Sequence, residues 1–447
     1  MVTVITYGTF DLFHEGHHRL LERAKALGDL LIVGVTTENY DESRGKLNVS
    51  QTLVERIENV RRSGLADEII VEEYEGQKID DIQRLGVDIF AIGSDWVGKF
   101  DYLKEYCLVV YLERTKGVSS TQLRNDTEGI TRFGIVGTGR IAKRFVVEAR
   151  YVSGVNVESV YSILPDEAAS FADHYELSGV AASYQDMLGK VDAVYVATPH
   201  QTHYEYAKQA LDAGVHVLCE KPMTLVAEQA LDLVQRAEAS GTVLLEAVKT
   251  AFLPGFQRLI AVTASGVIGK VRSVNATFTK LVESGREYDP EAGGSISELA
   301  TYPLLAVIKL LGPHPTDVRV TSLIPGESPV EVFSRIDLQY PHGIATATTG
   351  IGVKSEGELV IAGSKGYIYV PAPWWLTEYF ETRFDDQSQN KKYYHSFDGD
   401  GLRYELAEFT RMIRSGTRES FRLKPSESIA LATIIEQARC GAATIIV

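Results

Sequence analysis

Short apolar runs and amphipathic segments alternate along the first quarter of the chain. The apolar and β-branched runs predict strands at 4–6, 30–35, 68–71, 88–93 and 108–112. Between them, apolar residues recur every three or four positions, which predicts helices at 19–27, 52–63 and 79–85. Because strand and helix alternate, these elements are expected to form a parallel sheet with right-handed crossovers. The first part of the chain is therefore predicted to be an α/β domain.

A second series with the same alternation follows a polar, turn-rich stretch at 125–129. Its predicted strands are 133–136, 155–161, 193–196, 215–218 and 243–245, and its helices include 204–213 and 225–239. From residue 249 onward apolar residues alternate with polar ones, which is typical of antiparallel strands. Such strands are predicted at 271–280, 318–323, 330–338, 344–351, 358–361 and 367–370, with helices at 295–311, 402–414 and 427–441.

A chain of 447 residues is too long for one ordinary hydrophobic core. We therefore expect an α/β domain over 1–126 and a linker over 127–131. A second α/β domain, of the Rossmann type, is expected over 132–248. The remainder, 249–447, is expected to be an α+β domain with a mostly antiparallel sheet, suited to substrate binding and self-association.

Composition and charge exclude several classes of function. With 45% hydrophobic residues and no apolar run near the ~20 residues of a membrane helix, no membrane partner is expected. The N-terminus lacks the basic flank and cleavage site of a signal peptide, which indicates a cytoplasmic protein. A net charge of −15 without a concentrated basic surface argues against nucleic-acid binding. The cysteines, Cys107, Cys219 and Cys440, are far apart and suggest neither a disulfide framework nor a protein metal site.

The turn after the first predicted strand carries the first candidate catalytic residues, in the sequence YGTFDLFHEGH at 7–17. A strand-to-helix turn presents backbone N–H groups and the positive end of a helix dipole, where phosphates bind. His14 and His17 are three residues apart, so both can face one cluster of phosphate oxygens and stabilise charge as it develops. The alternative is that the two histidines only cap the helix.

This motif occurs together with RGK at 44–46, GSDWVGKFD at 93–101 and RTKGVSST at 114–121. In this order the motifs resemble the glycerol-3-phosphate cytidylyltransferase family over nearly all of residues 1–126. The resemblance implies a Rossmann-like nucleotidyltransferase in which His14 and His17 stabilise the transition state at the α-phosphate. It implies that the phosphates are held by Lys46, Arg44, Arg114, Thr115, Ser119 and Ser120. The other expected nucleotide contacts are Gly8, Thr9, Phe10, Asp95 and Trp96, of which the last two are alternatively a helix cap and a core aromatic residue.

Two residues depart from the family pattern. Lys116 replaces an acidic residue and Arg44 replaces a lysine, so both retain or add positive charge. These changes put the acceptor substrate in question more than the chemistry. The resemblance also implies Mg²⁺, because a metal bridging the triphosphate offsets charge that side chains alone leave exposed. Related enzymes with the HxGH motif use ATP, so the base stays open, although the RTKGVSST stretch favours CTP.

GIVGTGRIA at 134–142 follows a predicted strand and opens a helix, which gives the G-x-G-x-x-A pattern of dinucleotide-binding domains. Gly137 permits a tight turn, and Gly139 lets a pyrophosphate approach the backbone. Thr138, Arg140 and Ile141 complete the predicted cofactor loop. The next strand ends without the acidic residue that would grip a ribose 2′-hydroxyl, and Ser162 follows it instead. This favours NADP over NAD, although no arginine is adjacent.

ATPHQTH at 197–203 and CEKP at 219–222 end two further predicted strands, at the edge where open α/β sheets bind ligands. With GGSISELATYP at 293–303 and PAPWW at 371–375, these motifs resemble the Gfo/Idh/MocA oxidoreductases over almost all of residues 132–447. The resemblance implies that Lys221 orients the substrate oxygen and assists proton transfer, and that Tyr302 donates or accepts the proton. An ammonium group beside a tyrosine is expected to favour the phenolate. The remaining predicted cofactor contacts are Thr198, Pro199, His200 and Glu220.

Other residues near these motifs have less specific roles. His200 and His203 alternatively only begin a helix. Glu298 stands where the family usually has aspartate, and Ala251 stands where it has arginine, which leaves the contacts to substrate hydroxyls open. The candidate cations for a substrate phosphate are Lys249, Lys280, Arg286 and Arg403.

Together the two groups of motifs predict a bifunctional enzyme. One site would reduce a small keto compound, such as dihydroxyacetone or its phosphate, and the other would transfer CMP from CTP to the polyol phosphate. The product would be a CDP-polyol such as CDP-glycerol, for teichoic-acid-like or capsular polymers. The alternative is an active nucleotidyltransferase with a non-catalytic NAD(P)-binding module for regulation or oligomerisation, against which the Lys221–Tyr302 pair argues. By resemblance to both families, a homodimer or larger homo-oligomer is expected.

Overall fold

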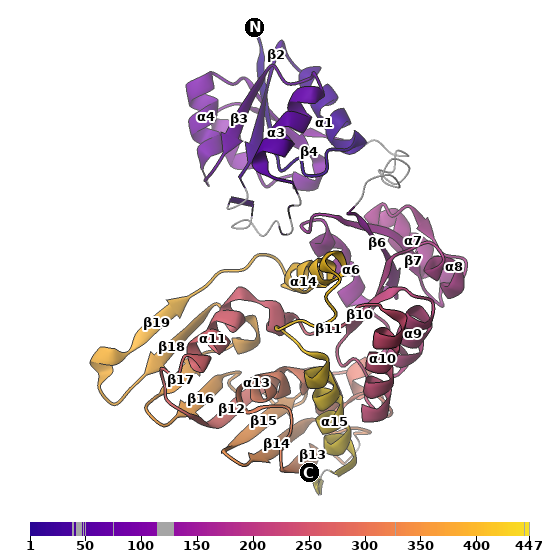
Figure 1. Cartoon of the computed structure of the whole chain (residues 1–447), viewed down its shortest axis with the longest axis vertical. Helices are drawn as coiled ribbons and strands as arrows, with labels where there is room; N and C mark the ends of the chain where they lie inside the picture. Colours follow the sequence, from indigo (N-terminus) through magenta and orange to yellow (C-terminus); the bar gives the residue numbers. More distant parts are fainter. Residues whose placement is uncertain are drawn as a thin grey trace. The chain divides into compact units, whose positions relative to one another are not determined.

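The computed structural model describes residues 1–37, 40, 41, 47, 49, 51–74, 76–113, 129–326, 328–441 and 443–446. The chain divides into two compact units (Figure 1). The first comprises Met1–Thr131 and Ala149–Glu158, and the second comprises Arg132–Glu148 and Ser159–Val447. None of the helices in the described ranges combines the length and the apolar character that crossing a bilayer requires.

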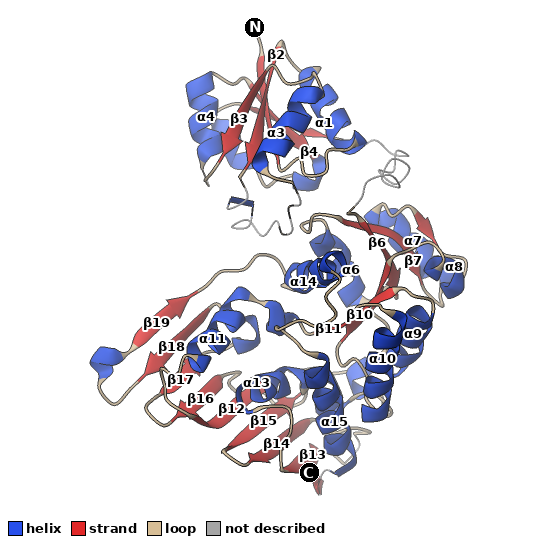
Figure 2. Ribbon diagram, in the orientation of Figure 1, coloured by secondary structure: helices blue, strands red, loops and turns tan. Residues whose placement is uncertain are grey.

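The first unit is built on a five-stranded parallel sheet with the order β3-β2-β1-β4-β5. Helices lie on both faces (Figure 2): α1 and α3 pack against Val4 and Val33, and α4 packs against Ile5 and Phe90. Because the central strands are buried on both faces, they form continuous apolar runs in the sequence. The elements are β1 (Thr3–Gly8), α1 (Glu15–Lys25), β2 (Leu30–Thr36), α3 (Leu53–Arg62), β3 (Glu68–Glu72), α4 (Gln77–Leu85), β4 (Ile89–Gly93), η1 (Ser94–Trp96), η2 (Asp101–Glu105) and β5 (Leu108–Leu112).

The second unit contains a six-stranded sheet with the order β11-β10-β9-β6-β7-β8. The strand order reverses at β6, so the connections after β6 and β9 leave the sheet in opposite directions and open a crevice between them. The elements are β6 (Thr131–Val136), α6 (Arg140–Ala149), β7 (Val155–Tyr161), α7 (Pro165–Tyr175), β8 (Gly179–Val180), α8 (Tyr184–Leu188), β9 (Ala193–Val196), η3 (His200–Thr202), α9 (His203–Asp212), β10 (His216–Glu220), α10 (Ala227–Ser240) and β11 (Leu244–Ala247).

The rest of the second unit is a nine-stranded, mostly antiparallel sheet with the order β19-β18-β17-β16-β12-β15-β14-β13-β20. Helices α13 and α15 cover one of its faces (Figure 1). The strands are β12 (Val271–Thr279), β13 (Asp317–Ile324), β14 (Phe333–Tyr340), β15 (Gly343–Gly350), β16 (Leu359–Gly363), β17 (Tyr367–Val370), β18 (Tyr379–Arg383), β19 (Lys391–Tyr394) and β20 (Ala443–Ile446). The helices are η4 (Lys249–Phe252), α11 (Pro254–Ala264), η5 (Arg286–Tyr288), α12 (Gly294–Leu299), α13 (Thr301–Leu311), η6 (Trp374–Leu376), η7 (Gln387–Gln389), α14 (Leu402–Ser415) and α15 (Pro425–Gly441).

The predicted fold class is confirmed, with one correction inside the last part. The single helix expected at 295–311 is two helices, α12 and α13, which meet at Ala300. Pro303 explains the break, because proline has no N–H with which to bond the carbonyl of Leu299, four residues earlier.

Helix α14 follows the antiparallel strands in sequence but packs on the six-stranded sheet, beside α6 (Figure 1). The ring of Phe409 on α14 lies 5.8 Å from that of Phe133 on β6. Arg403 on α14 forms a buried ion pair with Glu148 on α6, at 2.7 Å. The layer that carries the dinucleotide motif therefore includes a helix from near the end of the chain.

Candidate functional sites

The loop between β1 and α1 holds the first candidate residues in a strained backbone. Phe10 (φ 53°) and Leu12 (φ 46°) both adopt the left-handed conformation, which residues with side chains rarely use. The ring of Phe10 is buried and meets that of His17 edge-on, with centroids 5.4 Å apart. A Cβ atom at Gly8 would lie 3.0 Å from the Phe10 ring, so the glycine makes room for it. This packing fixes the loop so that α1 begins directly after His14.

His14 and His17 lie side by side at the start of α1, with ring centroids 3.9 Å apart. Nδ1 of His14 accepts a hydrogen bond from the Gly16 N–H (3.0 Å), and Nδ1 of His17 accepts one from the His14 N–H (3.4 Å). A neutral ring that accepts at Nδ1 carries its hydrogen on Nε2. The two histidines therefore cap the helix while each carries its hydrogen on Nε2, so the two alternatives from the sequence are compatible. A Cβ at Gly16 would lie 2.9 Å from the His14 ring, which explains the glycine between them.

A buried arginine supports this loop. Arg56 on α3 is fully buried and donates hydrogen bonds to the carbonyl oxygens of Thr9 and Thr36, both at 2.8 Å. Asp41 lies 3.5 Å from the guanidinium and accepts hydrogen bonds from the hydroxyls of Thr9 (2.9 Å) and Thr36 (2.7 Å). Sequence reasoning missed both Arg56 and Asp41. The only signal was a charged residue within the apolar stripe of the predicted helix at 52–63.

Arg56→Met is expected to lower the free energy of unfolding of the first unit by about 3–5 kcal/mol, because the Asp41 carboxylate would remain buried without its counter-charge. Urea denaturation of the full chain, with hydrogen exchange to separate the units, measures the change. Arg61→Met is the matched control, since Arg61 on the same helix is exposed and should contribute less than about 0.5 kcal/mol. An unchanged transition in Arg56→Met would contradict the supporting role.

Several predicted nucleotide contacts lie outside the described residues: Arg44, Lys46, Arg114, Thr115, Ser119 and Ser120, together with the side chain of Asp95. Their roles stay predictions. Trp96 in η1 is half-buried, and its ring packs 5.7 Å from that of Phe100 against the cluster around Phe90. Its core contacts are thus observed, and its contact with a nucleoside stays a prediction.

The loop between β6 and α6 has the shape that a dinucleotide requires. Gly137 has a φ of 103°, and a Cβ there would lie 2.6 Å from the carbonyl oxygen of Ala197. A Cβ at Gly139 would meet nothing within 4 Å, so the backbone is open on that side, at the start of α6. Backbone N–H groups at a helix start bind a pyrophosphate. The loop formed by Gly137, Thr138, Gly139, Arg140 and Ile141 therefore fits an NAD(P) cofactor.

Residues near the predicted adenosine ribose have opposing charges. The hydroxyl oxygen of Ser162 accepts a hydrogen bond from the Leu164 N–H (3.2 Å). The hydroxyl of Thr138 donates to the carboxylate of Glu167 at 2.9 Å. Arg140 is exposed at the same loop. The Glu167 carboxylate, which sequence reasoning did not weigh, opposes a 2′-phosphate, whereas Arg140 favours one.

Lys221 and Tyr302 come together from different parts of the second unit. Lys221 follows β10, and Tyr302 lies in the first turn of α13. The Lys221 ammonium lies 5.6 Å from the centre of the Tyr302 ring and donates a hydrogen bond to the backbone carbonyl of Glu298 (3.0 Å). Burial lowers the pKa of Lys221, although the carboxylates of Glu298 and Glu220 favour its charged form. A lysine with a lowered pKa gives up its proton more readily.

The net pKa shift of Tyr302 is opposite to the shift that an adjacent ammonium group alone would cause. Burial, with the carboxyl groups of Glu220, Glu405 and Glu298, raises the pKa of Tyr302. The desolvation of the phenolate and the nearby negative charges outweigh the ammonium group. Burial therefore keeps the Tyr302 phenol protonated, whereas it favours loss of a proton from the Lys221 ammonium.

Glu298, His200 and Arg286 lie beside Lys221. The Glu298 carboxylate is 3.7 Å from Nε2 of His200 and 3.3 Å from the Arg286 guanidinium. Burial lowers the pKa of His200, so its ring is neutral at ordinary pH. This group places a neutral imidazole and a fixed cation at the edge of the site.

His203 has a structural role. It begins α9, and its ring nitrogens lie 2.9 Å from the carbonyl oxygens of Pro222 and Thr198. Burial lowers its pKa to about 4, so the neutral ring donates to one of the two carbonyls at a time. It thereby ties together the segments that follow β9 and β10, which carry Thr198, Pro199 and Lys221.

Most of the candidate cations for a substrate phosphate already have partners. Lys280 pairs with Glu287 at 2.8 Å, and Arg403 pairs with Glu148. The ammonium of Lys249 donates to the carbonyl oxygen of Asp400 at 3.0 Å. These contacts leave Arg286, held by Glu298 at the site edge, as the best placed of the four.

Glu246 at the end of β11 is a buried acid, and its protonation should affect the stability of the second unit. Its Oε1 accepts the Met223 N–H at 2.9 Å, and burial raises its pKa to about 7, an effect that Ser428 and Met223 partly offset. Because the pKa of Glu246 is higher in the folded state, this group stabilises the folded state fully at pH values below the ordinary carboxyl pKa near 4.5. The stabilisation is lost as the pH rises through 7. Glu246→Gln should remove about 3 kcal/mol of this pH dependence. The Tm of the NAD(P)H-stabilised transition measures it, and parallel curves for both proteins between pH 4.5 and 7 would contradict it.

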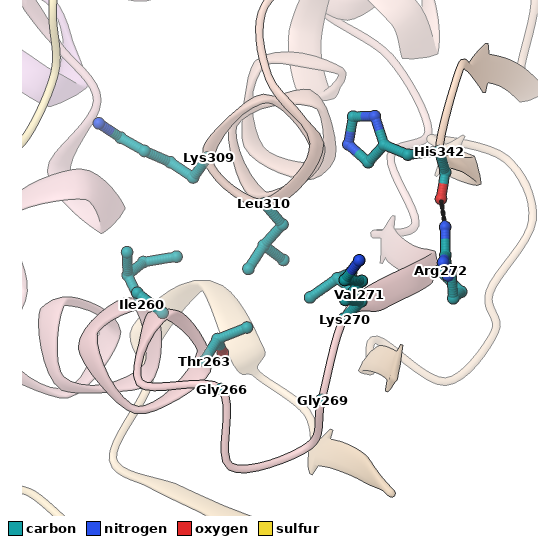
Figure 3. Close-up of a pocket in the computed structure, with 11 residues that line it drawn as sticks. Ile260, Thr263, Gly266, Gly269, Lys270, Val271, Arg272, Lys309, Leu310 and His342 are labelled. Carbon is teal, nitrogen blue, oxygen red and sulfur yellow. Dashed lines mark hydrogen bonds between the residues drawn. The ribbon is translucent and has the colours of Figure 1, made fainter. Parts of the chain in front are cut away.

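A cavity of about 460 Å³ lies elsewhere in the second unit, between α11, α13 and the start of β12 (Figure 3). Leu310 points into it, whereas Lys309 extends away and pairs with Glu427 at 2.6 Å (Figure 3). Arg272 at its rim donates to the backbone carbonyl of His342 at 2.8 Å. None of the residues that line this cavity is a candidate catalytic or cofactor-binding residue.

Comparison with known families gives a match in each part of the chain. Residues 5–126 match the cytidylyltransferase-like family. Residues 131–247 match an oxidoreductase family with an NAD-binding Rossmann fold, and residues 256–369 match the GFO/IDH/MocA C-terminal domain.

Individual relatives cover the two parts separately. The glycerol-3-phosphate cytidylyltransferase of Bacillus spizizenii is 52% identical over 126 residues, which are 28% of this chain and 97% of that protein. The trans-1,2-dihydrobenzene-1,2-diol dehydrogenase of Mus musculus is 30% identical over 319 residues, which are 69% of this chain and 96% of that protein. The 3-ketoreductase KijD10 of Actinomadura kijaniata, solved with NADP, matches with a TM-score of 0.61 and 25% identity over 71% of this chain and 99% of that chain. The chain therefore joins a cytidylyltransferase-like domain to an oxidoreductase of the GFO/IDH/MocA family, and it is both a cytidylyltransferase and an NAD(P)-dependent oxidoreductase.

Proposed function

We propose that the chain reduces a small keto compound with NAD(P)H and transfers CMP from CTP to the resulting polyol phosphate. Dihydroxyacetone phosphate is the ketone we favour, since its reduction gives glycerol phosphate. The products are then a CDP-polyol, such as CDP-glycerol, and pyrophosphate. The observation that carries the proposal is that His14 and His17 stack in the segment that follows β1, and that Lys221, directly after β10, lies beside Tyr302 at the start of α13.

The geometry at the start of α1 supports CMP transfer. The Nε2–H groups of the stacked His14 and His17 rings are donors for a phosphate whose charge grows in the transition state. Among the described residues, no cluster of three or more His, Cys, Asp or Glu side chains could hold a metal ion. Mg²⁺ would accordingly enter with CTP, held mainly by the triphosphate.

The geometry around Lys221 supports reduction. The loop at Gly137–Gly139 fits the cofactor pyrophosphate, and NAD(P)H supplies hydride to the carbonyl carbon. Tyr302, whose buried phenol is protonated, is the group that we assign to give the carbonyl oxygen its proton. Lys221, held by the Glu298 carbonyl, orients that oxygen and restores the proton.

The fusion supports consecutive use of the two sites, because linking them raises effective concentration only for reactions that share an intermediate. A CDP-polyol is a precursor for teichoic-acid-like or capsular polymers. CTP and NAD(P)H are cytosolic metabolites, so we assign the reactions to the cytoplasm. We also propose that the chain acts as a homo-oligomer, as the sequence resemblance implies.

A coupled assay tests the proposal. The full chain is incubated with CTP, Mg²⁺ and dihydroxyacetone phosphate, with NADPH or NADH in separate reactions. A panel of other three- to five-carbon ketoses, with and without phosphate, runs in parallel, and mass spectrometry detects CDP-linked products. We expect CDP-glycerol only when CTP, the ketone and a reduced cofactor are all present.

Two outcomes would reject parts of this proposal. CMP transfer to added glycerol phosphate without oxidation of either cofactor by any ketone would reject the reduction step and favour a non-catalytic NAD(P)-binding module. Cofactor oxidation by a different ketose, with the matching CDP-polyol as product, would reject the substrate but keep the reaction sequence.

A further inference from the structure

Glu167, in the first turn of α7, is an acid whose side chain reaches the predicted cofactor loop. Its carboxylate accepts a hydrogen bond from the hydroxyl of Thr138 at 2.9 Å. The two residues are 29 positions apart, so this bond joins the loop after β6 to the helix after β7. It holds a negative charge beside the backbone that fits the cofactor.

The carboxyl end of β7 is the place where the adenosine ribose of a dinucleotide is expected. β7 is the neighbour of β6 in the sheet, and the glycine loop follows β6. In dinucleotide-binding domains an acid near the end of this second strand holds the ribose 2′-hydroxyl of NAD. Here β7 ends at Tyr161 and Ser162 follows, so the strand end itself carries no acid. Glu167 supplies the carboxylate from the next helix instead.

The start of α7 offers few groups that could bind the 2′-phosphate of NADPH. A phosphate requires cations or free N–H donors. The Leu164 N–H already donates to the Ser162 hydroxyl at 3.2 Å, and Pro165, the first residue of α7, has no N–H. The first turn carries Asp166 and Glu167, two acids that interact favourably with the helix dipole. A 2′-phosphate would therefore meet negative charge at this place.

Arg140 is the cation of the same loop, but it lies at a different point of it. It begins α6 directly after Gly139, where the pyrophosphate common to both cofactors is expected. Within the described part of the chain, Glu167 bonds to the neutral Thr138 hydroxyl and forms no ion pair with this guanidinium. We therefore expect Arg140 to attract NADH and NADPH alike and to leave the charge of Glu167 uncompensated.

We propose that Glu167, held by Thr138, makes the oxidoreductase prefer NADH to NADPH. The carboxylate accepts a hydrogen bond from the free ribose 2′-hydroxyl of NADH and repels the 2′-phosphate of NADPH. Thr138 is a positioning residue, because its hydroxyl holds the carboxylate at the loop. The lack of an acid at the end of β7 favoured NADP in the sequence, and the acid on α7 reverses that expectation. This preference concerns the cofactor alone, so it does not depend on the ketone proposed above.

Direct binding to the full chain tests the preference with no substrate present. NADH and NADPH are titrated separately, and each Kd is read from the fluorescence of the reduced nicotinamide. The wild type should bind NADH about tenfold or more tightly than NADPH. Glu167→Gln should bind NADPH about tenfold more tightly than the wild type does, because the amide removes the repulsion. It should bind NADH more weakly, since a neutral acceptor forms a weaker hydrogen bond.

Three outcomes of this titration would overturn the inference. The first is a wild type that binds NADPH as tightly as NADH, or more tightly. The second is a ratio of the two Kd values that does not change in Glu167→Gln. The third is a failure to bind either cofactor, which would also contradict the assignment as an oxidoreductase. Glu167→Lys extends the test, because a cation at this position should make NADPH the tighter ligand.

Two further variants separate Glu167 from a general effect of charge. Asp173→Asn is the matched control: Asp173 is an exposed acid on the same helix, away from its start, and its loss should leave the ratio within about twofold. A shift as large as that of Glu167→Gln would overturn the inference. Thr138→Val removes the bond that holds the carboxylate, so it should shift the ratio toward NADPH by less than Glu167→Gln. An unchanged ratio would overturn the positioning role of Thr138.

Arg140→Met distinguishes the two charges at the loop. It should weaken the binding of NADH and NADPH by the same factor, because the pyrophosphate is common to both. A loss of NADPH affinity alone would place the 2′-phosphate at Arg140 and overturn the inference.

Discussion

His14→Ala and His17→Ala should each lower kcat for CMP transfer by about 10²–10³-fold, the usual cost of removing one donor aimed at developing charge. Both rings accept at Nδ1 and therefore offer Nε2–H from adjacent, stacked positions. Loss of either ring removes a donor that hydration replaces poorly. Pyrophosphate release from CTP, with glycerol phosphate as acceptor, measures the effect.

The controls for this prediction separate chemistry from helix capping. His14→Asn keeps a capping side chain but lacks Nε2, so it should be as inactive as His14→Ala while keeping the wild-type Tm. His18→Ala, one residue further along α1, should retain wild-type kcat, since His18 is near Glu22 (3.5 Å) instead. Ketone reduction should be unchanged in every variant. A loss of less than about fivefold in both His14 variants would contradict the assignment.

Lys221→Met and Tyr302→Phe should each lower kcat for ketone reduction by about 10²–10⁴-fold, as expected for loss of a general acid or its partner. The two groups are 5.6 Å apart, measured from the ammonium to the ring centre, and both are partly buried. Oxidation of NADPH or NADH, followed by absorbance, measures the loss. CMP transfer should continue at the wild-type rate.

The pH dependence and a matched lysine variant complete this test. Burial lowers the pKa of Lys221, so the ammonium form is lost at a lower pH than for an ordinary lysine. The rate of ketone reduction, plotted against pH, should therefore decline on its alkaline limb as Lys221 loses its proton. Tyr302→Phe should keep the position of this limb at a lower rate. Lys270→Met, at the rim of the 460 Å³ cavity, should behave like the wild type in both reactions. A strong effect of Lys270→Met would place substrate in that cavity instead.

Local sequence signals predicted the parts of both sites that lie within one loop. The glycines at 8, 16, 137 and 139 and the histidines at 14 and 17 are close to one another in the chain. Strand-to-helix turns have strict backbone requirements, so the residue pattern alone indicates them. The structure places these residues at the ends of β1 and β6, as expected.

Contacts between distant segments were not predictable in the same way. Arg56 and Asp41 are 15 positions apart and meet only because α3 packs on β2. Arg403 is far in sequence from Glu148, and no local pattern shows that its helix returns to the first sheet of its unit. The direction of the Tyr302 pKa shift was not predicted for the same reason, because two of the three carboxyl groups that raise this pKa come from distant segments of the chain.

Secondary structure was missed where the usual signals were weak. The strands β18 and β19 contain the charged residues Glu381, Arg383, Lys391 and Lys392, which interrupt the apolar alternation. They form the outer hairpin at one edge of the nine-stranded sheet, where charged side chains discourage pairing with other chains. The break between α12 and α13 was readable from Pro303 but was overlooked within a long apolar run.

The path of the chain through α14 limits how this enzyme can be recombined with its relatives. A cassette that exchanged residues 132–248 alone would separate Glu148 from Arg403 and Phe133 from Phe409. The graft would bury the carboxylate of Glu148 without its counter-charge and leave a cavity where the rings of Phe133 and Phe409 now pack. Chimaeras that change cofactor preference must therefore carry residues 402–415 along with the donor cassette, whereas grafts of the outer hairpin need no such companion.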